Sequence, residues 1–197
     1  MFENTNWKAV SAEIMGTFFL VFFGVSSLTN NAGVVSEDDG TLHILIGLTT
    51  LTLTLFVLVH ILGPVSGCHL NPVISIPTYL SDKMDRDTTV AYIGGQIIGA
   101  CLGFYLFDLI NPGTSNSILD GDSALLLAAM VGTTFFVTSL LTSQDPGSIA
   151  ATLFIVSSTV FGEVNPSVSI GNMIATDVEF MFFGIVGSLI GCIIGWG

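Results

Sequence analysis

The sequence predicts an all-α transmembrane fold, with a bundle of six membrane-spanning helices and two re-entrant half-helices arranged as an inverted internal repeat. Three observations lead to this prediction. Of the 197 residues, 51% are hydrophobic and only 9% are charged, whereas soluble domains carry about 25% charged residues. Long apolar segments recur along the chain, and two short ones each begin with Asn-Pro. We expect residues 1–197 to form a single transmembrane domain.

Six apolar segments supply the spans. A helix needs roughly 20 apolar residues to cross the hydrocarbon core of a bilayer. The segments are 7–28, 42–62, 88–110, 122–142, 147–161 and 178–196. The fifth would form only about 22 Å of helix, less than the core thickness of about 30 Å. A cleaved signal peptide is an alternative for the first segment, but Glu13 interrupts its apolar run.

The few basic residues predict the orientation. Lys8 precedes the first span, and Lys83 and Arg86 lie between the second and third. An even number of crossings separates them, so the positive-inside rule places all three, and both termini, in the cytoplasm. We expect a multi-pass protein held in the lipid bilayer of the cell (plasma) membrane. The net charge of −12 argues against nucleic acid as a partner.

Three pairs of similar segments recur in the same order. They divide the chain into repeat 1, approximately residues 7–110, and repeat 2, approximately residues 122–196. Each repeat holds three spans, an odd number, so the second must lie inverted in the membrane. Inverted repeats place a solute site at their interface, built from broken helices. The pairs are 12–19 with 128–135, 66–73 with 160–167, and Gly95, Gly99 and Gly103 with Gly187, Gly191 and Gly195.

Two Asn-Pro elements predict the half-helices. Each opens an apolar run that is too short to cross the membrane, and helix breakers at 63–67 precede the first of them. Asn suits the N-cap of a helix, and Pro suits the first turn, where its missing N–H has no partner to lose. The opening triplets are Asn71-Pro72-Val73 and Asn165-Pro166-Ser167.

Half-helices that enter from opposite faces would meet start to start inside the membrane. Each helix start carries roughly +0.5 charge, so a cation is repelled there while a neutral molecule passes. The amides of Asn71 and Asn165 can donate hydrogen bonds to a passing oxygen. We therefore expect a channel for water and small neutral solutes, and no enzymatic activity. No His, Cys or acidic residues have metal-ligand spacing, so we expect no metal and no cofactor.

These residues resemble the aquaporin and aquaglyceroporin family, the major intrinsic proteins, over nearly the whole chain. The resemblance implies one pore per subunit, a homotetramer, and Asn71 and Asn165 at the pore centre. It is strongest in Ala12-Glu13-x-x-Gly16-Thr17, Gly63-Pro64-x-Ser66-Gly67-x-His69-x-Asn71-Pro72 and Tyr92-x-x-x-Gln96-x-x-Gly99-Ala100.

The sequence departs from the family at the pore. The family's Asn-Pro-Ala triplets end here in Val73 and Ser167, and Val168 stands where the family usually places an arginine in the outer filter. Without a guanidinium, the mouth should be wider and more apolar, which favours glycerol-like solutes beside water. The other filter positions correspond to Leu51, Gly162 and Leu153.

Glu13 is a carboxylate inside a span, and its family counterpart braces the re-entrant loops. We expect it to bond His69 or the loop backbone. The equivalent residue in repeat 2 is Ala129, while Glu163 replaces His69. Glu163 either supplies the acceptor that Ala129 lacks, which we prefer, or faces the pore and attracts cations.

Other readings of the chain remain. A secondary transporter also has inverted repeats, but coupling usually needs buried ionisable groups, and only Glu13 and Glu163 qualify. A cation-leaky or non-conducting member of the same fold is a further alternative. Among the cysteines, Cys101 and Cys192 fit as packing residues, whereas Cys68 lies three residues before Asn71, where we expect it to line the pore.

Overall fold

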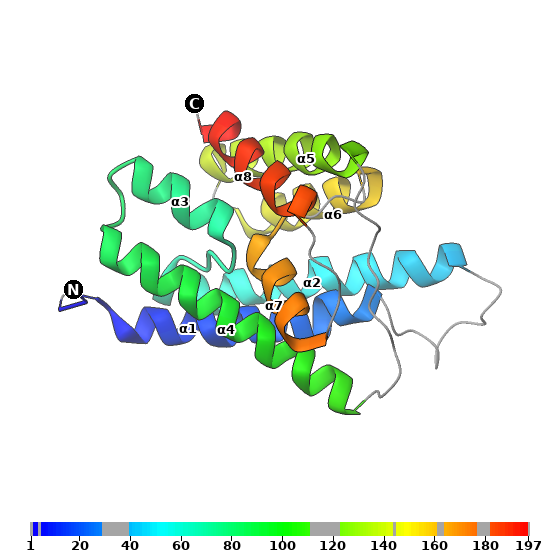
Figure 1. Cartoon of the computed structure of the whole chain (residues 1–197), viewed down its shortest axis with the longest axis horizontal. Coiled ribbons are helices and arrows are strands. Elements are labelled where there is room, and N and C mark those ends of the chain that lie inside the picture. Colours follow the sequence, from blue (N-terminus) through cyan, green and yellow to red (C-terminus); the bar gives the residue numbers. More distant parts are fainter. Residues whose placement is uncertain are drawn as a thin grey trace.

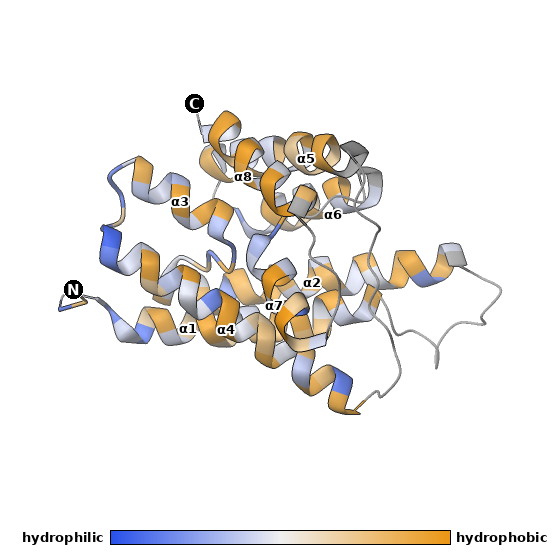
Figure 2. Cartoon of the chain, viewed as in Figure 1, coloured by the Kyte–Doolittle hydropathy of each residue, from blue (hydrophilic) through white to orange (hydrophobic). Residues whose placement is uncertain are grey.

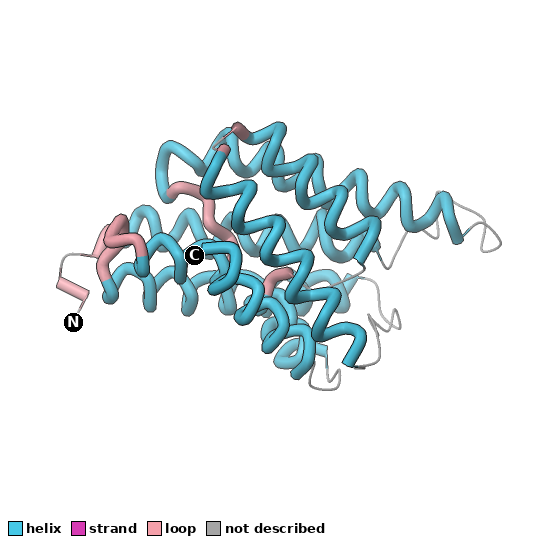
Figure 3. The backbone as a smooth tube through the Cα atoms, turned by 90° about the horizontal axis from the view of Figure 1, so that it is seen from above, coloured by secondary structure: helices cyan, strands magenta, loops and turns pink. Residues whose placement is uncertain are grey.

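The computed structural model describes residues 2–3, 5–28, 40–110, 123–143, 145–160, 164–176 and 182–196. Within these ranges the chain is helical and contains no strand, which confirms the predicted all-α class (Figure 1). The elements are α1 (Trp7–Phe19), the π-helical turn η1 (Leu20–Gly24), the 3-10 turn η2 (Val25–Leu28), α2 (Gly40–Ser66), α3 (Pro72–Leu80), α4 (Arg86–Ile110), α5 (Ser123–Thr142), α6 (Pro146–Val160), α7 (Pro166–Thr176) and α8 (Phe182–Trp196). The described loops between α2 and α3 and between α3 and α4 are short (Figure 3).

The helices carry an apolar outer surface. Among the described residues, three helical segments are long and apolar enough to cross a membrane, namely Trp7–Leu28, Thr41–Ser66 and Arg86–Ile110. Three shorter apolar helices accompany them, Leu126–Thr142, Pro146–Ser158 and Phe183–Trp196. Large side chains such as Tyr105 (62% exposed) and Val131 (60% exposed) point outward, and Figure 2 shows apolar residues along nearly every helix. An outer surface of this kind suits lipid rather than water.

One predicted boundary is wrong. The sequence suggested that the chain breaks from Gly63 onwards, but α2 continues through Gly63 and Pro64 to Ser66. The Gly67 N–H donates to the Gly63 carbonyl at 2.9 Å and closes the last turn. Proline is tolerated here because it costs one hydrogen bond near the end of a helix of 27 residues. The break comes at Gly67, whose φ of +84° is open to glycine at little cost.

Glycines bring two helix pairs into backbone contact in the same way. On α4, a Cβ added to Gly99 would collide with the Ile14 carbonyl of α1. On α8, a Cβ added to Gly191 would collide with the Met130 carbonyl of α5. Small residues allow such close approach between helices inside a membrane. The pairs α1–α4 and α5–α8 are therefore packed by equivalent contacts.

The half-helices lie between these two pairs. Both α3 and α7 pack against α4 and against α8. Gly171 of α7 lies against the backbone of α4 at Ala100 and Cys101, while the Cys192 thiol of α8 approaches the Val73 carbonyl of α3 at 3.3 Å. Each half-helix thus contacts the last long helix of the opposite half, and this arrangement positions the site described below.

The glycine contacts predict opposite effects for two neighbouring substitutions on α4. Gly99→Ala should lower the free energy of unfolding by about 1–3 kcal/mol, because the new methyl group meets backbone that cannot move aside. Gly94→Ala is the matched control, since nothing lies within 4 Å of its added Cβ, and it should stabilise the helix by about 0.5–1 kcal/mol. Thermal unfolding of the detergent-solubilised protein measures both. Equal melting temperatures for the two variants would contradict the close packing.

Candidate functional site: a pore between two half-helices

The start of each half-helix is capped by its own asparagine. Asn71 precedes α3 in an extended conformation (φ −156°, ψ 128°), and its side-chain oxygen accepts a hydrogen bond from the Val73 N–H at 3.1 Å. The side-chain oxygen of Asn165 accepts from the Ser167 N–H at 3.2 Å. Pro72 and Pro166 occupy the first helical positions, as predicted for the two triplets. The caps turn both amide NH₂ groups away from their own helices.

The two asparagines then meet across the repeat boundary. The Asn71 amide nitrogen donates to the Val164 carbonyl at 2.7 Å, and the Asn165 amide nitrogen donates to the Leu70 carbonyl at 2.9 Å. Each amide thus bonds the carbonyl of the residue that precedes the other asparagine. The starts of α3 and α7 therefore face each other inside the bundle rather than lying on opposite surfaces.

A cavity of about 700 Å³ passes this junction and is lined by both asparagines. Along α2 it is bordered from Ile44 to Val59, which corresponds to about 22 Å of helix. At the other end it reaches Ser81 and Lys83, which follow α3. A space that runs along most of a span and past the junction has the form of a pore.

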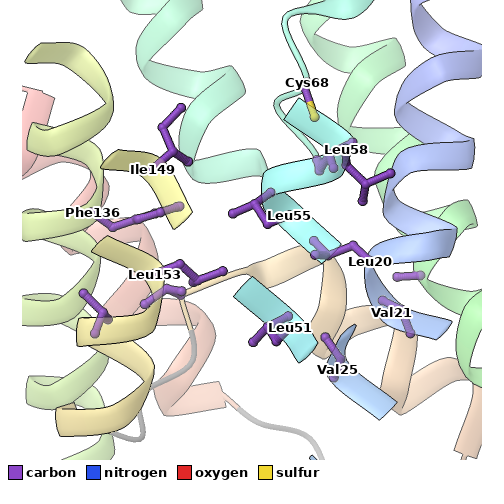
Figure 4. Close-up of a cluster of buried hydrophobic side chains, with 14 of the residues drawn as sticks. Leu20, Val21, Val25, Leu51, Leu55, Leu58, Cys68, Phe136, Ile149 and Leu153 are labelled. Atoms are coloured by element: carbon purple, nitrogen blue, oxygen red, sulfur yellow. The ribbon is translucent and has the colours of Figure 1, made fainter. Parts of the chain in front are cut away.

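The walls of this cavity are mostly aliphatic. In Figure 4, side chains of α2 and of the turns η1 and η2 lie on one side, and those of α5 and α6 lie on the other. Among the described residues that line it, Lys83 is the one with a permanent positive charge. The labelled side chains that line it are Leu20, Val25, Leu51, Leu55, Cys68, Phe136, Ile149 and Leu153.

Most of the residues singled out from the sequence lie at this cavity. Its lining includes Asn71, Asn165, Val73, His69 and Cys68, and the filter candidates Leu51, Leu153 and Val168. Pro72, Pro166 and Ser167 are buried behind it in the half-helices. Gly162 and Glu163 lie outside the described residues, so the two hypotheses for Glu163 stay predictions.

Glu13 holds the loop that leads into α3. Its carboxylate is fully buried and accepts four hydrogen bonds from two directions. Oε1 accepts from the Ser66 hydroxyl at 2.6 Å and the His69 N–H at 3.0 Å, while Oε2 accepts from the Leu70 N–H at 2.6 Å and the Gln96 amide at 2.9 Å. Four donors satisfy a buried carboxyl group whose loss of hydration would otherwise be very costly inside a membrane.

The loop needs this support because its backbone is strained. Cys68 and Leu70 have φ of 51° and 50°, a left-handed conformation that costs a non-glycine residue about 1–3 kcal/mol. The Leu70 N–H is bound by Glu13, and the Cys68 N–H is bound by the Ser66 hydroxyl at 3.0 Å. The same loop presents the Leu70 carbonyl to Asn165, so the brace positions one side of the junction.

The contact between Glu13 and His69 runs through the backbone of His69. The His69 ring instead pairs with the Ser75 hydroxyl at 3.1 Å, which also receives a hydrogen bond from Gln96 at 3.1 Å. The sequence reasoning assigned no role to Ser66, Ser75 or Gln96. Tyr92 and Gln96 are one helical turn apart on α4 and both face the loop, where the Tyr92 hydroxyl donates to the Ser66 carbonyl at 2.8 Å. Their spacing of four residues was the available signal.

Comparison with known proteins identifies relatives of this chain. The family profile described as "Major intrinsic protein" matches residues 1–196. The chain is 28% identical over 162 residues to "Probable aquaporin PIP2-7" of Oryza sativa subsp. japonica, an alignment that covers 76% of this chain and 55% of the relative. It is 32% identical over 106 residues to "Lens fiber major intrinsic protein" of Rattus norvegicus, covering 54% of this chain and 38% of the relative.

A third relative is "Aquaporin-4" of Mus musculus, also 32% identical over 106 residues, covering 54% of this chain and 32% of the relative. These alignments span between about a third and about half of the length of the curated relatives.

The brace predicts a strong effect of Glu13→Gln. The new NH₂ group cannot accept, so two buried donors lose their partner, and the free energy of unfolding should fall by about 1–3 kcal/mol for each of them. The loss should appear as a lower melting temperature and as aggregation on size-exclusion chromatography in detergent. Asp85→Asn is the control, since Asp85 caps α4 at an exposed position through Thr88. A Glu13→Gln variant as stable as Asp85→Asn would contradict the bracing role.

Proposed function

The chain belongs to the major intrinsic protein family, and on that premise we propose that it is a membrane channel for passive flux of water and small neutral solutes. Its apolar helices and its family make it an integral membrane protein. The observation that carries the channel proposal is the reciprocal pair of hydrogen bonds at the asparagines, with a cavity alongside. The proposal includes no enzymatic step.

The electrostatics of the junction support selection of neutral molecules. The starts of α3 and α7 each carry roughly +0.5 charge, and here they are directed at one another, which disfavours a cation at this point. Each asparagine amide has two hydrogens, and the bonds to Leu70 and Val164 use one on each side. The second hydrogen of each amide can donate to the oxygen of a passing solute.

The lining supports glycerol-like solutes beside water. Three aliphatic side chains line the cavity, namely Leu51, Leu153 and Val168. Val168 adds no charge at the position where the major intrinsic protein family usually has an arginine. A wide, apolar passage gives room for the carbon face of a small polyol, while the two amides bind its hydroxyl groups. We assign the filter to these residues together with Gly162.

The remaining parts of the proposal concern assembly and orientation. We propose that two inverted repeats form one channel domain, that the subunits assemble as a homotetramer in the plasma membrane, and that both termini face the cytoplasm. The basic residues of the chain support that orientation through the positive-inside rule. They are Lys8, Lys83 and Arg86. The outward-facing apolar side chains supply surface for both lipid and neighbouring subunits.

Stopped-flow light scattering on proteoliposomes tests the function. Vesicles containing the protein should shrink faster than protein-free vesicles under an impermeant osmolyte, and should re-swell faster with glycerol outside. Flux should rise linearly with the gradient and should be independent of ion gradients. Saturable uptake driven by an ion gradient would favour a secondary transporter, and flux equal to that of empty vesicles would refute the proposal.

A substitution at the filter tests the solute preference. Val168→Arg should narrow the mouth and add donors that hold water, so glycerol flux relative to water flux should fall about tenfold or more, because a change of only 1.4 kcal/mol in the barrier is tenfold in rate. Val168→Met, a long uncharged side chain, is the control for size. Equal ratios in wild type and Val168→Arg would remove Val168 from the filter.

A thiol reagent tests the path. Cys68 is a free cysteine that lines the cavity, so a mercurial should inhibit flux in the wild type and have little effect on Cys68→Ser. Cys101→Ser, which changes a cysteine that does not line the cavity, should remain sensitive. Inhibition of Cys68→Ser as strong as that of the wild type would place the path elsewhere.

A further inference from the structure

The two asparagines are not equivalent, because the third residue of each triplet differs. The Ser167 hydroxyl donates to the side-chain oxygen of Asn165 at 2.7 Å, in addition to the Ser167 N–H at 3.2 Å. Val73 occupies the equivalent position and offers the Asn71 oxygen only its N–H, at 3.1 Å. The Asn165 oxygen therefore accepts two hydrogen bonds and the Asn71 oxygen accepts one.

The serine one turn further along each half-helix makes the same backbone contact in the two repeats. Ser75 and Ser169 each point back to the backbone carbonyl of their own asparagine, at 3.4 and 3.3 Å. Ser167 lies in the first turn of α7, and the residue four positions before it lies outside the helix. Its hydroxyl therefore has no helical carbonyl to bond and donates to the asparagine side chain instead. Ser167 is fully buried, which keeps water from competing for this bond.

The extra bond acts on the amide that faces the cavity. A hydrogen bond to an amide oxygen draws electron density from the nitrogen, so its N–H groups become stronger donors, by about 10–30% per bond in condensed-phase estimates. The bond also restricts rotation of the side chain, because a turn of the Asn165 amide would break three hydrogen bonds, whereas a turn of the Asn71 amide would break two. The Asn165 side chain is thus held by one more hydrogen bond than the Asn71 side chain, and this bond strengthens its amide N–H groups as donors.

We propose that Ser167 is a positioning residue that makes Asn165 the dominant donor to solutes with an accepting oxygen, such as urea or a polyol. The inference rests on the proposed channel function and names the side of the junction where the solute oxygen is held. Ser167 itself does not line the cavity and acts only through the Asn165 amide, whereas Asn71 supplies a weaker contact from the opposite half-helix.

Solid-state NMR of the side-chain amides in the lipid-reconstituted protein tests the inference directly. In Ser167→Ala the Asn165 amide protons should move upfield, towards the position of the Asn71 signal, and in Ser167→Thr they should stay in place. The reciprocal variant Val73→Ser should move the Asn71 signal downfield. Ser169→Ala is the matched control, because it removes a hydroxyl from the same helix that bonds only the backbone carbonyl of Asn165.

Flux measurements on the same variants give the functional result. The ratio of urea permeability to water permeability should fall about twofold or more in Ser167→Ala. The ratio should stay at the wild-type value in Ser167→Thr, which keeps the hydroxyl, and in Ser169→Ala. An unmoved Asn165 signal, or equal ratios in Ser167→Ala and Ser169→Ala, would overturn the inference.

The two proposals fail in different ways. If wild-type vesicles conduct no better than lipid, the channel function is refuted, while the NMR shifts still decide whether Ser167 polarises Asn165. If Ser167→Ala does not fold, Val73→Ser remains decisive, since an unmoved Asn71 signal in that variant would refute the effect of a hydroxyl at this position.

Discussion

The structure depends on one exchange of hydrogen bonds, in which each asparagine amide donates to the carbonyl that precedes the other asparagine. This exchange directs the starts of two half-helices at one another, although their partial positive charges repel. The repulsion is tolerable because each start is capped and because the exchanged bonds replace water that a membrane interior cannot provide. Without the exchange, the ends of two short helices would leave unpaired backbone groups at membrane depth.

The surrounding helices make the exchange possible by being close and rigid. Gly99 and Gly191 bring α4 onto α1 and α8 onto α5 at backbone distance, and the half-helices fill the space between these pairs. The two halves repeat this packing, and the described residues show its polar support in the first half. In the first half, Glu13 gathers four donors around the strained loop, whereas the second half has Ala129 at the equivalent position.

Apolar side chains cover both the outer surface of this protein and the wall of its cavity, with different effects. On the outside they meet lipid, and burial in the bilayer has the same physical origin as burial in a core. On the inside, Leu51, Leu153 and Val168 line the cavity, where they offer a solute no hydrogen bonds. In the proposed channel, the polar contacts for a solute come from the asparagine amides, the loop backbone and a few polar side chains of the lining, such as His69 and Thr78.

The sequence by itself determined the membrane class, the order of the apolar helices and the places of Asn71 and Asn165 at the starts of two half-helices, because apolar length and Asn-Pro capping are local properties of a chain. The family resemblance was confirmed by the profile match over residues 1–196. Only the tertiary structure decided that α2 continues past Pro64, that Glu13 bonds the backbone of His69 rather than its ring, and that Ser167 turns to Asn165. These outcomes depend on which donors and acceptors distant segments bring within about 3 Å of one another, and no periodicity or spacing along one chain contains that information.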